Sequence, residues 1–248
     1  MSRYYKHTSR KQMLEEFHHK YLQEHGWFES IKNMDSVDKN GPVPWFTYPA
    51  LSMLKKLVNK NHRVFEFGAG NSTLWWANQV REIVAVEHDK EWAKHIQDQI
   101  GPKGEVHSVP MDSNIDEGES HLIRRFFDKG LTPPLSEDND RNMRAGLTTK
   151  PFVGYAAKLL AYPNSYFNII VVDGMARVLC AWLAANRLDS DGFIIFDNAD
   201  RSEYDIAYKI LIDEGFARID FWGPGPINSY EWCTSIFTKS LSVFDNCV

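Results

Sequence analysis

The sequence predicts an α/β fold: a doubly wound, mostly parallel sheet of seven strands with an antiparallel hairpin at its C-terminal end. Short apolar runs that suit buried strands alternate with segments whose apolar residues recur at helical spacing. Such strands, joined by helices, are typical of a parallel sheet covered on both faces. The last two runs, 218–222 and 234–239, are separated by Gly223-Pro224-Gly225-Pro226 and a loop without a helix, which indicates the hairpin.

Length, charge and composition narrow the class of protein. The chain has 248 residues, enough for one large domain with a sizeable core. Its net charge of −5 disfavours nucleic acid as a partner. No apolar run approaches the roughly 20 residues that cross a membrane, and residues 1–7 open no signal-peptide pattern. Three cysteines without CxxC spacing indicate reduced thiols. We therefore expect a cytoplasmic protein that acts on a small molecule, with no nucleic-acid or membrane partner.

Residues 1–62 are expected to form a helical and aromatic cover. A helix is predicted over 9–23, capped by Ser9, and loops are expected at 26–28 and 35–40. Prolines and aromatics fill the segment 42–48, and Pro49 then begins a helix with one apolar face. This segment either covers a ligand cleft or only packs its aromatic rings, and the sequence leaves both open.

The remaining residues, 63–248, are expected to form the main domain, with an insert at about 112–150. The insert is polar and mixed in charge, and only 121–127 has a helical pattern. A loop this long is usually a lid or a disordered insert, and we favour a lid near the substrate. The expected strands are 63–67, 83–86, 105–110, 168–173, 193–197 and the two of the hairpin. The expected helices are 72–80, 89–100 with Trp92 inward, 155–161, 177–186 and 203–214 with a capping box of Ser202 and Asp205.

Acidic residues end four of the predicted buried strands: Glu66, Glu87, Asp173 and Asp197. A carboxylate at a buried strand end needs partners, so packing alone gives little reason for this pattern. In open α/β sheets the ligand lies outside the carboxyl ends of the strands, where the strand order reverses. These acids therefore predict a ligand site at that edge.

A glycine-rich turn follows the first strand, and its sequence is Gly68-Ala69-Gly70-Asn71-Ser72-Thr73. Glycines let the backbone approach a ligand closely, and the N–H groups that start the next helix face the cleft. A dinucleotide would place its pyrophosphate there, but Thr73 stands where its third glycine is usual. Glu66 would repel a phosphate and attract a sulfonium cofactor. Glu87 suits ribose hydroxyls in either case.

Glu66-Phe67-Gly68-Ala69-Gly70-Asn71-Ser72-Thr73 resembles the first motif of class I S-adenosylmethionine-dependent methyltransferases, and Val86-Glu87 resembles their second. The terminal hairpin is also similar to theirs, on a Rossmann-like sheet. The resemblance implies that Glu66, Gly68 and Gly70 line the methionine part of the cofactor, within a loop that extends to Thr73. It implies that Glu87 binds the ribose, His88 lies near the adenine, and Asp112 binds the adenine amino group.

Val172-Asp173-Gly174 and Phe196-Asp197-Asn198 resemble a narrower group, the metal-dependent O-methyltransferases of the catechol and caffeoyl-CoA type. That resemblance implies Asp173, Asp197 and Asn198 as ligands of Mg²⁺, which prefers oxygen donors. Those enzymes carry a lysine base after the first Asp, whereas this chain has Arg177. Arginine stays protonated and is a poor base, but it can clamp a carboxylate or phosphate.

The sequence thus predicts methyl transfer from S-adenosylmethionine to a small polar acceptor through an oxygen or nitrogen nucleophile, with Asp173 and Arg177 as catalytic residues. Two alternatives stay open. One is an NAD(P)-dependent oxidoreductase, supported by the glycine loop and Glu87. The other is a non-catalytic module that only binds the cofactor.

Overall fold

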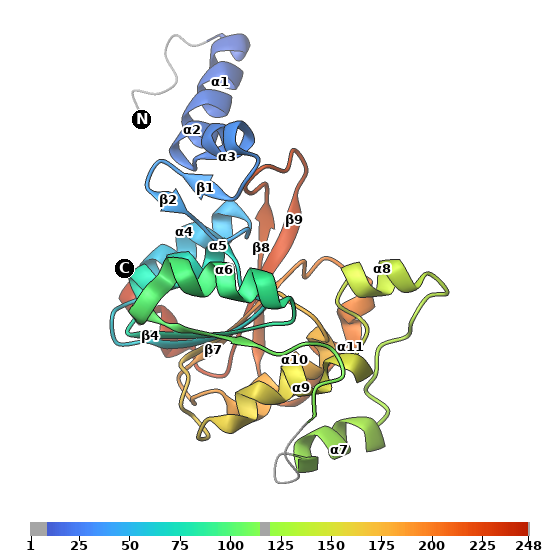
Figure 1. Ribbon diagram of the computed structural model, residues 1–248. Helices are drawn as coiled ribbons and strands as arrows, with labels where there is room; N and C mark the ends of the chain where they lie inside the picture. The colour runs from blue at the N-terminus through green and yellow to red at the C-terminus, as the bar shows by residue number, and fades with distance from the viewer. Residues whose placement is uncertain (1–8, 115–119, 248) are drawn as a thin grey trace.

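The protein, described here from a computed structural model over residues 9–114 and 120–247, is built on a seven-stranded sheet in the order β5-β4-β3-β6-β7-β9-β8 (Figure 1). The strands are β3 (Arg63–Phe67), β4 (Glu82–Glu87), β5 (Glu105–Ser108), β6 (Ile169–Val172), β7 (Phe193–Asp197), β8 (Ala217–Gly223) and β9 (Trp232–Thr238). The first five pair in parallel, and β9 runs antiparallel to both β7 and β8. The predicted fold class and hairpin are confirmed.

Helices cover both faces of the sheet. Successive strand residues point to opposite sides, and the strands β3, β6 and β7 are buried on both sides, so each packs against two helix layers. Val64 and Val171 pack in the cluster under the first helix layer, whereas Phe65 and Val172 pack in the cluster under the second. The first layer holds α4 (Tyr48–Leu57), α5 (Asn71–Gln79) and α6 (Lys90–Ile100). The second holds α9 (Val153–Ala157), α10 (Arg177–Arg187) and α11 (Asp205–Asp213), with α7 (Ser120–Asp128) beside α10.

The N-terminal helix projects from the body of the molecule (Figure 1). It runs through α1 (Arg10–Glu16), a π-helical turn η2 (Phe17–Tyr21) and α2 (Leu22–Glu24), and Ser9 and Gln12 form its capping box. A loop was expected at 26–28, but the helix α3 (Trp27–Asn33) begins there. Gly26, at φ +83°, turns the chain between the two helices, and a Cβ at this position would lie 2.5 Å from that of Asp38. Two short strands, β1 (Val37–Asp38) and β2 (Gly41–Pro42), follow.

The described part of the 112–150 insert packs against the domain. Besides α7 it contains α8 (Asn139–Arg144), which the sequence did not indicate and which is capped by the side chain of Asp138. Phe126 and Leu147 are buried in the core, and Trp182 of α10 donates its indole N–H to the carbonyl of Leu122 over 2.9 Å. Residues 115–119 of the insert, like the N-terminal residues 1–7, lie outside the described residues.

Two further local predictions are wrong. The capping box of Ser202 and Asp205 does not form, because Ser202–Tyr204 make a 3₁₀ turn and no side chain caps α11. Trp92 does not face the core: its side chain is exposed and its indole is held by a backbone carbonyl.

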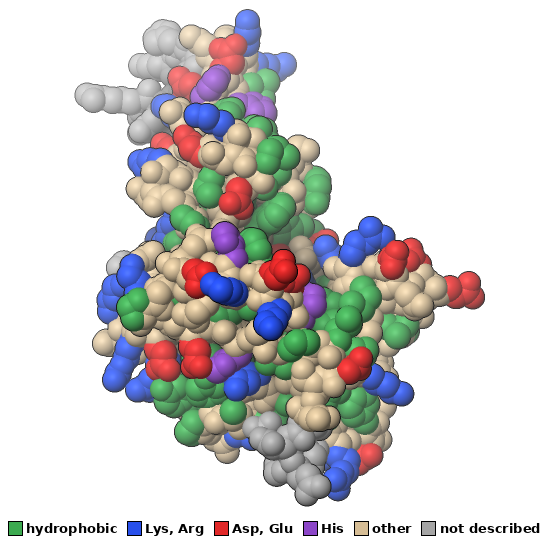
Figure 2. All heavy atoms as spheres, in the orientation of Figure 1, with side chains coloured by type: hydrophobic (Ala, Val, Ile, Leu, Met, Phe, Trp, Pro, Cys, Tyr) green, Lys and Arg blue, Asp and Glu red, His purple; other side chains and the backbone are tan. Residues whose placement is uncertain are grey.

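The surface and the helices add two observations. On the face in view, acidic and basic side chains are mixed over α6 (Figure 2). Within residues 9–114 and 120–247, the helices are too short or too polar for any of them to cross a membrane.

Candidate functional site

The candidate site lies where the strand order of the sheet reverses. β3 pairs with β4 on one side and β6 on the other, so the chain turns away in opposite directions at the C-terminal ends of β3 and β6. The two loops that follow are tied to the neighbouring strands: Gly68 N donates to Val86 O over 2.9 Å, and Asp173 N donates to Phe67 O over 3.2 Å. A cavity of about 460 Å³ opens above them.

Most of the residues predicted to bind the cofactor meet in this cavity. Those that line it are Gly68, Ala69, Gly70, Asn71, Ser72, Glu87 and His88, together with the predicted catalytic residues Asp173 and Arg177. Three predicted residues do not line it. Glu66 and Thr73 are buried beneath the loop, and Asp112 is exposed, with its backbone N–H bonded to Pro151.

Glycines allow the two loops to touch. Gly68 has φ +95°, and a Cβ there would lie 3.1 Å from the carbonyl oxygen of Asp173. A Cβ on Gly174 would lie 2.1 Å from the hydroxyl of Tyr155 and 2.9 Å from Gly68 N. Side chains at either position would push the loops apart, so the floor of the cavity depends on these glycines.

Glu66 supports the loop from below. Its Oε2 accepts a hydrogen bond of 2.5 Å from Thr73 Oγ1, which in turn accepts one of 3.0 Å from Gly70 N. Its Oε1 is buried without a partner among the described residues. Burial raises the pKa of Glu66 to about 8, so the carboxyl is mostly protonated at neutral pH. Glu66 therefore acts on the cavity through the backbone of the glycine loop.

Glu87 ends β4 at the rim of the cavity. Its Oε2 accepts a bond from Ala69 N over 3.1 Å, and its Oε1 accepts bonds from the backbone N–H groups of His88 and Asp89 over 2.8 and 2.9 Å. Burial alone would raise the pKa of Glu87, but these bonds and one from the His88 side chain outweigh it and lower the pKa. The hydrogen bond between the His88 side chain and the Glu87 carboxylate also raises the pKa of His88. Glu87 is thus an ionised acceptor at the cavity.

Sequence reasoning missed several residues that line the cavity. Trp92 donates its indole N–H to Ala69 O over 2.7 Å and stays 44% exposed. Tyr155 is fully buried, with its hydroxyl unpaired among the described residues. Asp35 accepts a bond of 2.7 Å from the Asn71 side chain. The remaining missed residues are Ser36, Arg144 and Met175, whereas Trp45 belongs to the segment 42–48 that the sequence left open as a cleft cover, and Gly174 to the motif around Asp173. No local motif marks the missed positions, because distant segments bring them together.

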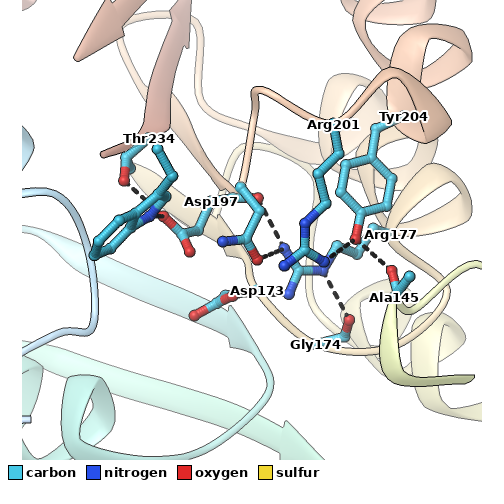
Figure 3. A network of polar contacts seen from close by, with 10 residues as sticks. Ala145, Asp173, Gly174, Arg177, Asp197, Arg201, Tyr204 and Thr234 are labelled. Carbon is cyan, nitrogen blue, oxygen red and sulfur yellow. Dashed lines mark hydrogen bonds and ion pairs between the residues drawn. The ribbon is translucent and has the colours of Figure 1, made fainter. Parts of the chain in front are cut away.

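Arg177 takes up the space between the strand ends (Figure 3). Its Nη2 donates to Asp173 Oδ1 over 2.9 Å, its Nη1 donates to Asp197 O over 2.8 Å and Asn198 Oδ1 over 3.3 Å, and its Nε donates to Gly174 O over 3.1 Å. The guanidinium is buried, and these bonds occupy most of its donors. They leave little capacity for clamping a substrate anion.

The residues predicted as magnesium ligands do not fit a magnesium ion. The Oδ1 atoms of Asp173 and Asn198 face the Arg177 guanidinium, and Asp197 Oδ1 accepts bonds from Thr234 Oγ1 over 2.6 Å and Trp232 Nε1 over 3.1 Å. The positive charge that an ion would bring is already supplied by arginine. Among the described residues no group of three or more His, Cys, Asp and Glu is suited to a metal. The Mg²⁺ prediction is therefore not supported.

Solved structures resemble this chain, whereas no protein-family model and no curated protein matches it. The match to precorrin-6y C5,15-methyltransferase from Geobacter metallireducens GS-15 covers 85% of this chain and 96% of that protein, with a TM-score of 0.50 and 12% sequence identity. The match to precorrin 8w decarboxylase from Methanobacterium thermoautotrophicum covers 77% of this chain and 88% of that protein, with a TM-score of 0.45 and 16% sequence identity. The match to a TehB-like SAM-dependent methyltransferase from Corynebacterium glutamicum covers 78% of this chain and 88% of that protein, with a TM-score of 0.44 and 10% sequence identity.

The first of these similarities, together with the strand order, identifies the fold. The sheet differs from a dinucleotide-binding Rossmann sheet by the antiparallel β9, which lies between β7 and β8. The chain has the fold of class I S-adenosylmethionine-dependent methyltransferases.

Proposed function

We propose that this protein transfers a methyl group from S-adenosylmethionine to a small polar acceptor, through an oxygen or nitrogen nucleophile. The observation that carries the proposal is Glu87, an ionised carboxylate that opens onto the same cavity as the glycine loop. Among the described residues its Oε2 accepts only the bond from Ala69 N and keeps acceptor capacity for ribose hydroxyls. The cavity volume of about 460 Å³ falls within the usual range for small-molecule sites.

The lining residues suit the separate parts of this cofactor. Gly68 and Gly70 leave room for the methionine part, and Glu87 takes the ribose hydroxyls. The rings of His88 and Trp92 line the same cavity and suit contact with the adenine. The cofactor supplies a methyl group on a positively charged sulfur. The acids that line the cavity are Asp35, Glu87 and Asp173, of which Asp173 is paired with Arg177, and the ionised Glu87 suits the positive charge of the cofactor.

The chain's own contribution to rate is positioning and the exclusion of water. Trp45 from the 1–62 segment and Arg144 from the 112–150 insert both line the cavity, which supports a covering role for each segment. Arg177 stays protonated and cannot act as a base. We assign it a positioning role, because its bonds join the loops after β6 and β7.

Calorimetric titration with S-adenosylmethionine, its demethylated product and NADH tests the proposal. We expect the first two to bind and NADH not to bind. Glu87→Gln removes the ionised acceptor and should weaken binding by about 10- to 100-fold, the usual value of a charged hydrogen bond. Glu91→Gln, an acid in the first turn of α6 that does not line the cavity, is the matched control and should bind normally.

Two results would favour the alternatives that the sequence left open. Binding of NADH without S-adenosylmethionine would indicate an oxidoreductase, for which the glycine loop and Glu87 also fit. Tight binding of S-adenosylmethionine with no methyl transfer to any acceptor would indicate a non-catalytic module.

A further inference from the structure

A second cavity, of about 400 Å³, adjoins the cofactor cavity and shares Trp45 and Asp173 with it. Its other lining residues are Asp197, Asn198, Arg201, Asn228, Tyr230 and Trp232. A molecule in this second cavity would meet the same carboxylate, Asp173, as a molecule in the first. The arrangement suits a methyl acceptor beside a methyl donor.

The charges that line the second cavity are not all neutralised by the protein. Asp173 is paired with Arg177 over 2.9 Å. Asp197 has no ion pair among the described residues: its Oδ1 accepts bonds from Thr234 and Trp232, and no described group donates to its Oδ2. In Figure 3 the carboxylates of Asp173 and Asp197 both lie on the side of the Arg177 guanidinium away from Tyr204.

Arg201 carries the opposite charge in the same cavity. Within the described residues it forms no ion pair, and its side chain makes one long hydrogen bond of 3.4 Å to the Tyr204 hydroxyl. The neighbouring acid Glu203 is instead paired with Arg141 over 2.8 Å. Most of the five N–H donors of the Arg201 guanidinium are therefore available to a ligand.

Aromatic rings complete the cavity. The side chains of Trp45 and Tyr230 are 46% and 64% exposed, and that of Trp232 is buried. Aromatic faces bind flat organic groups and also attract cations. Among the described residues the cavity thus joins an acid without an ion pair, Asp197, a cation without an ion pair, Arg201, and aromatic rings.

Building on the methyl transfer proposed above, we infer that the second cavity binds the acceptor and that the acceptor is a zwitterion, with an amine that is methylated and an acid group. Asp197 binds the ammonium end and Arg201 binds the acid group, while Trp45 and Tyr230 contact the carbon frame between them. An acceptor with one charge would leave either Asp197 or Arg201 without a partner.

Asp197 also serves the reaction in this arrangement. The bound ammonium gives one proton to Asp197 Oδ2, which leaves a neutral amine with a free electron pair. That pair forms a bond to the methyl carbon while the carbon–sulfur bond breaks and its electrons stay on sulfur. The products are a methylammonium, the neutral thioether and a proton on Asp197, which later passes to solvent. Burial and the neighbouring Asp173 raise the pKa of Asp197 to about 7, which suits this exchange.

Three related probes test the inference on the protein saturated with the demethylated cofactor. They are 4-(aminomethyl)benzoate, which has both charges, benzylamine, which has only the amine, and 4-methylbenzoate, which has only the acid. We expect the first probe to bind at least about 10-fold more tightly than either of the others, as one charged hydrogen bond contributes. Equal binding of all three, tightest binding of 4-methylbenzoate, or no binding of any would overturn the inference.

Variants then assign the two ends. Asp197→Asn should weaken 4-(aminomethyl)benzoate and benzylamine but not 4-methylbenzoate, whereas Arg201→Gln should weaken the two benzoates but not benzylamine. Asp213→Asn, at an acid that pairs with Lys209 on the surface, and Arg124→Gln, at an exposed arginine of α7, are matched controls and should change nothing. Any other pattern contradicts the assignment of the ends. Titration with S-adenosylmethionine distinguishes a failure of this inference from a failure of the proposed function. Asp197 and Arg201 do not line the cofactor cavity, so the cofactor should still bind if only the inference is wrong.

Discussion

The guanidinium of Arg177 and the carboxylate of Asp173 form a salt bridge of 2.9 Å between Nη2 and Oδ1, with only 8% and 26% of their side chains exposed. The same guanidinium bonds the Asp197 carbonyl and the Asn198 side chain. One cation therefore holds together the loops that follow β6 and β7. It stands where the resemblance to metal-dependent enzymes implied a magnesium ion.

Removing Arg177 should destabilise the protein. Arg177→Met keeps most of the side-chain volume but leaves Asp173 as a partly buried charge without its partner, a change that typically costs about 3–5 kcal/mol. The free energy of unfolding, measured in urea at pH 7, checks this. The double variant Arg177→Met/Asp173→Asn removes both charges and should recover part of the loss. A loss below about 1 kcal/mol, the value of an exposed ion pair, would contradict the structural role.

Gly70→Ala separates the fold from cofactor binding. Gly70 has φ −175°, which any residue adopts, and no protein atom lies within 4 Å of a Cβ built there. Stability should change by no more than about 0.5 kcal/mol. The new methyl group projects beside the cofactor cavity, so the affinity for S-adenosylmethionine should fall. Thermal unfolding and calorimetry measure the two effects, and unchanged affinity would argue against a ligand in close contact with this loop.

The strands of the sheet could be predicted because a short, continuous run of apolar residues in the sequence marks each buried strand. Runs such as Ile169–Val172 are fully apolar, and buried parallel strands require that pattern. The acids at the strand ends were predictable for the same reason. The glycine loop follows β3 and Glu87 ends β4, as the sequence indicated, and both line one cavity.

The rest of the site depends on contacts between distant segments, which no local pattern encodes. Arg177 reaches the Asp197 carbonyl 20 residues away, and Asp35 reaches Asn71 36 residues away. The exposed indole of Trp92 was assigned to the core because its spacing fits the apolar face of α6, but its N–H bonds Ala69 O. A helical pattern of apolar residues does not distinguish packing from the lining of a cavity.

Glu66→Gln should change how stability depends on pH. Burial raises the pKa of Glu66 from 4.5 to about 8, so the folded protein keeps a proton that the unfolded chain loses. Its contribution is fully present below pH about 4.5 and is lost as pH rises toward 8, by up to about 1.4 kcal/mol per pH unit. The groups around the carboxyl are Ser72, Thr73, Trp76 and the charged Asp173.

The variant carries no titratable group at position 66, so its stability relative to the natural protein should rise between pH 5 and pH 8. Urea unfolding at several pH values measures this difference. Glu91→Gln alters an exposed acid and should run parallel to the natural protein. A constant difference between Glu66→Gln and the natural protein across this range would show that Glu66 is ionised in the fold.

Methyl transfer to an amine acceptor should depend on pH through Asp197. Its pKa is raised to about 7 by burial and by Asp173, against the opposing charge of Arg177, and Arg201 also lines its cavity. Only the ionised form binds the ammonium and accepts its proton. The value of kcat/KM should therefore rise about tenfold per pH unit below pH 7 and level off above it.

Asp197→Asn should remove this rising limb and lower kcat by about 10²- to 10⁴-fold, the usual contribution of a general base. Rates are measured as release of the demethylated cofactor with 4-(aminomethyl)benzoate as acceptor, from pH 5.5 to pH 9. Asp213→Asn should keep the natural profile, because Asp213 pairs with Lys209 at the surface. A rising limb that persists in Asp197→Asn would assign the titration to another group, and Asp173, the other acid of the cavity, would then be the residue to substitute.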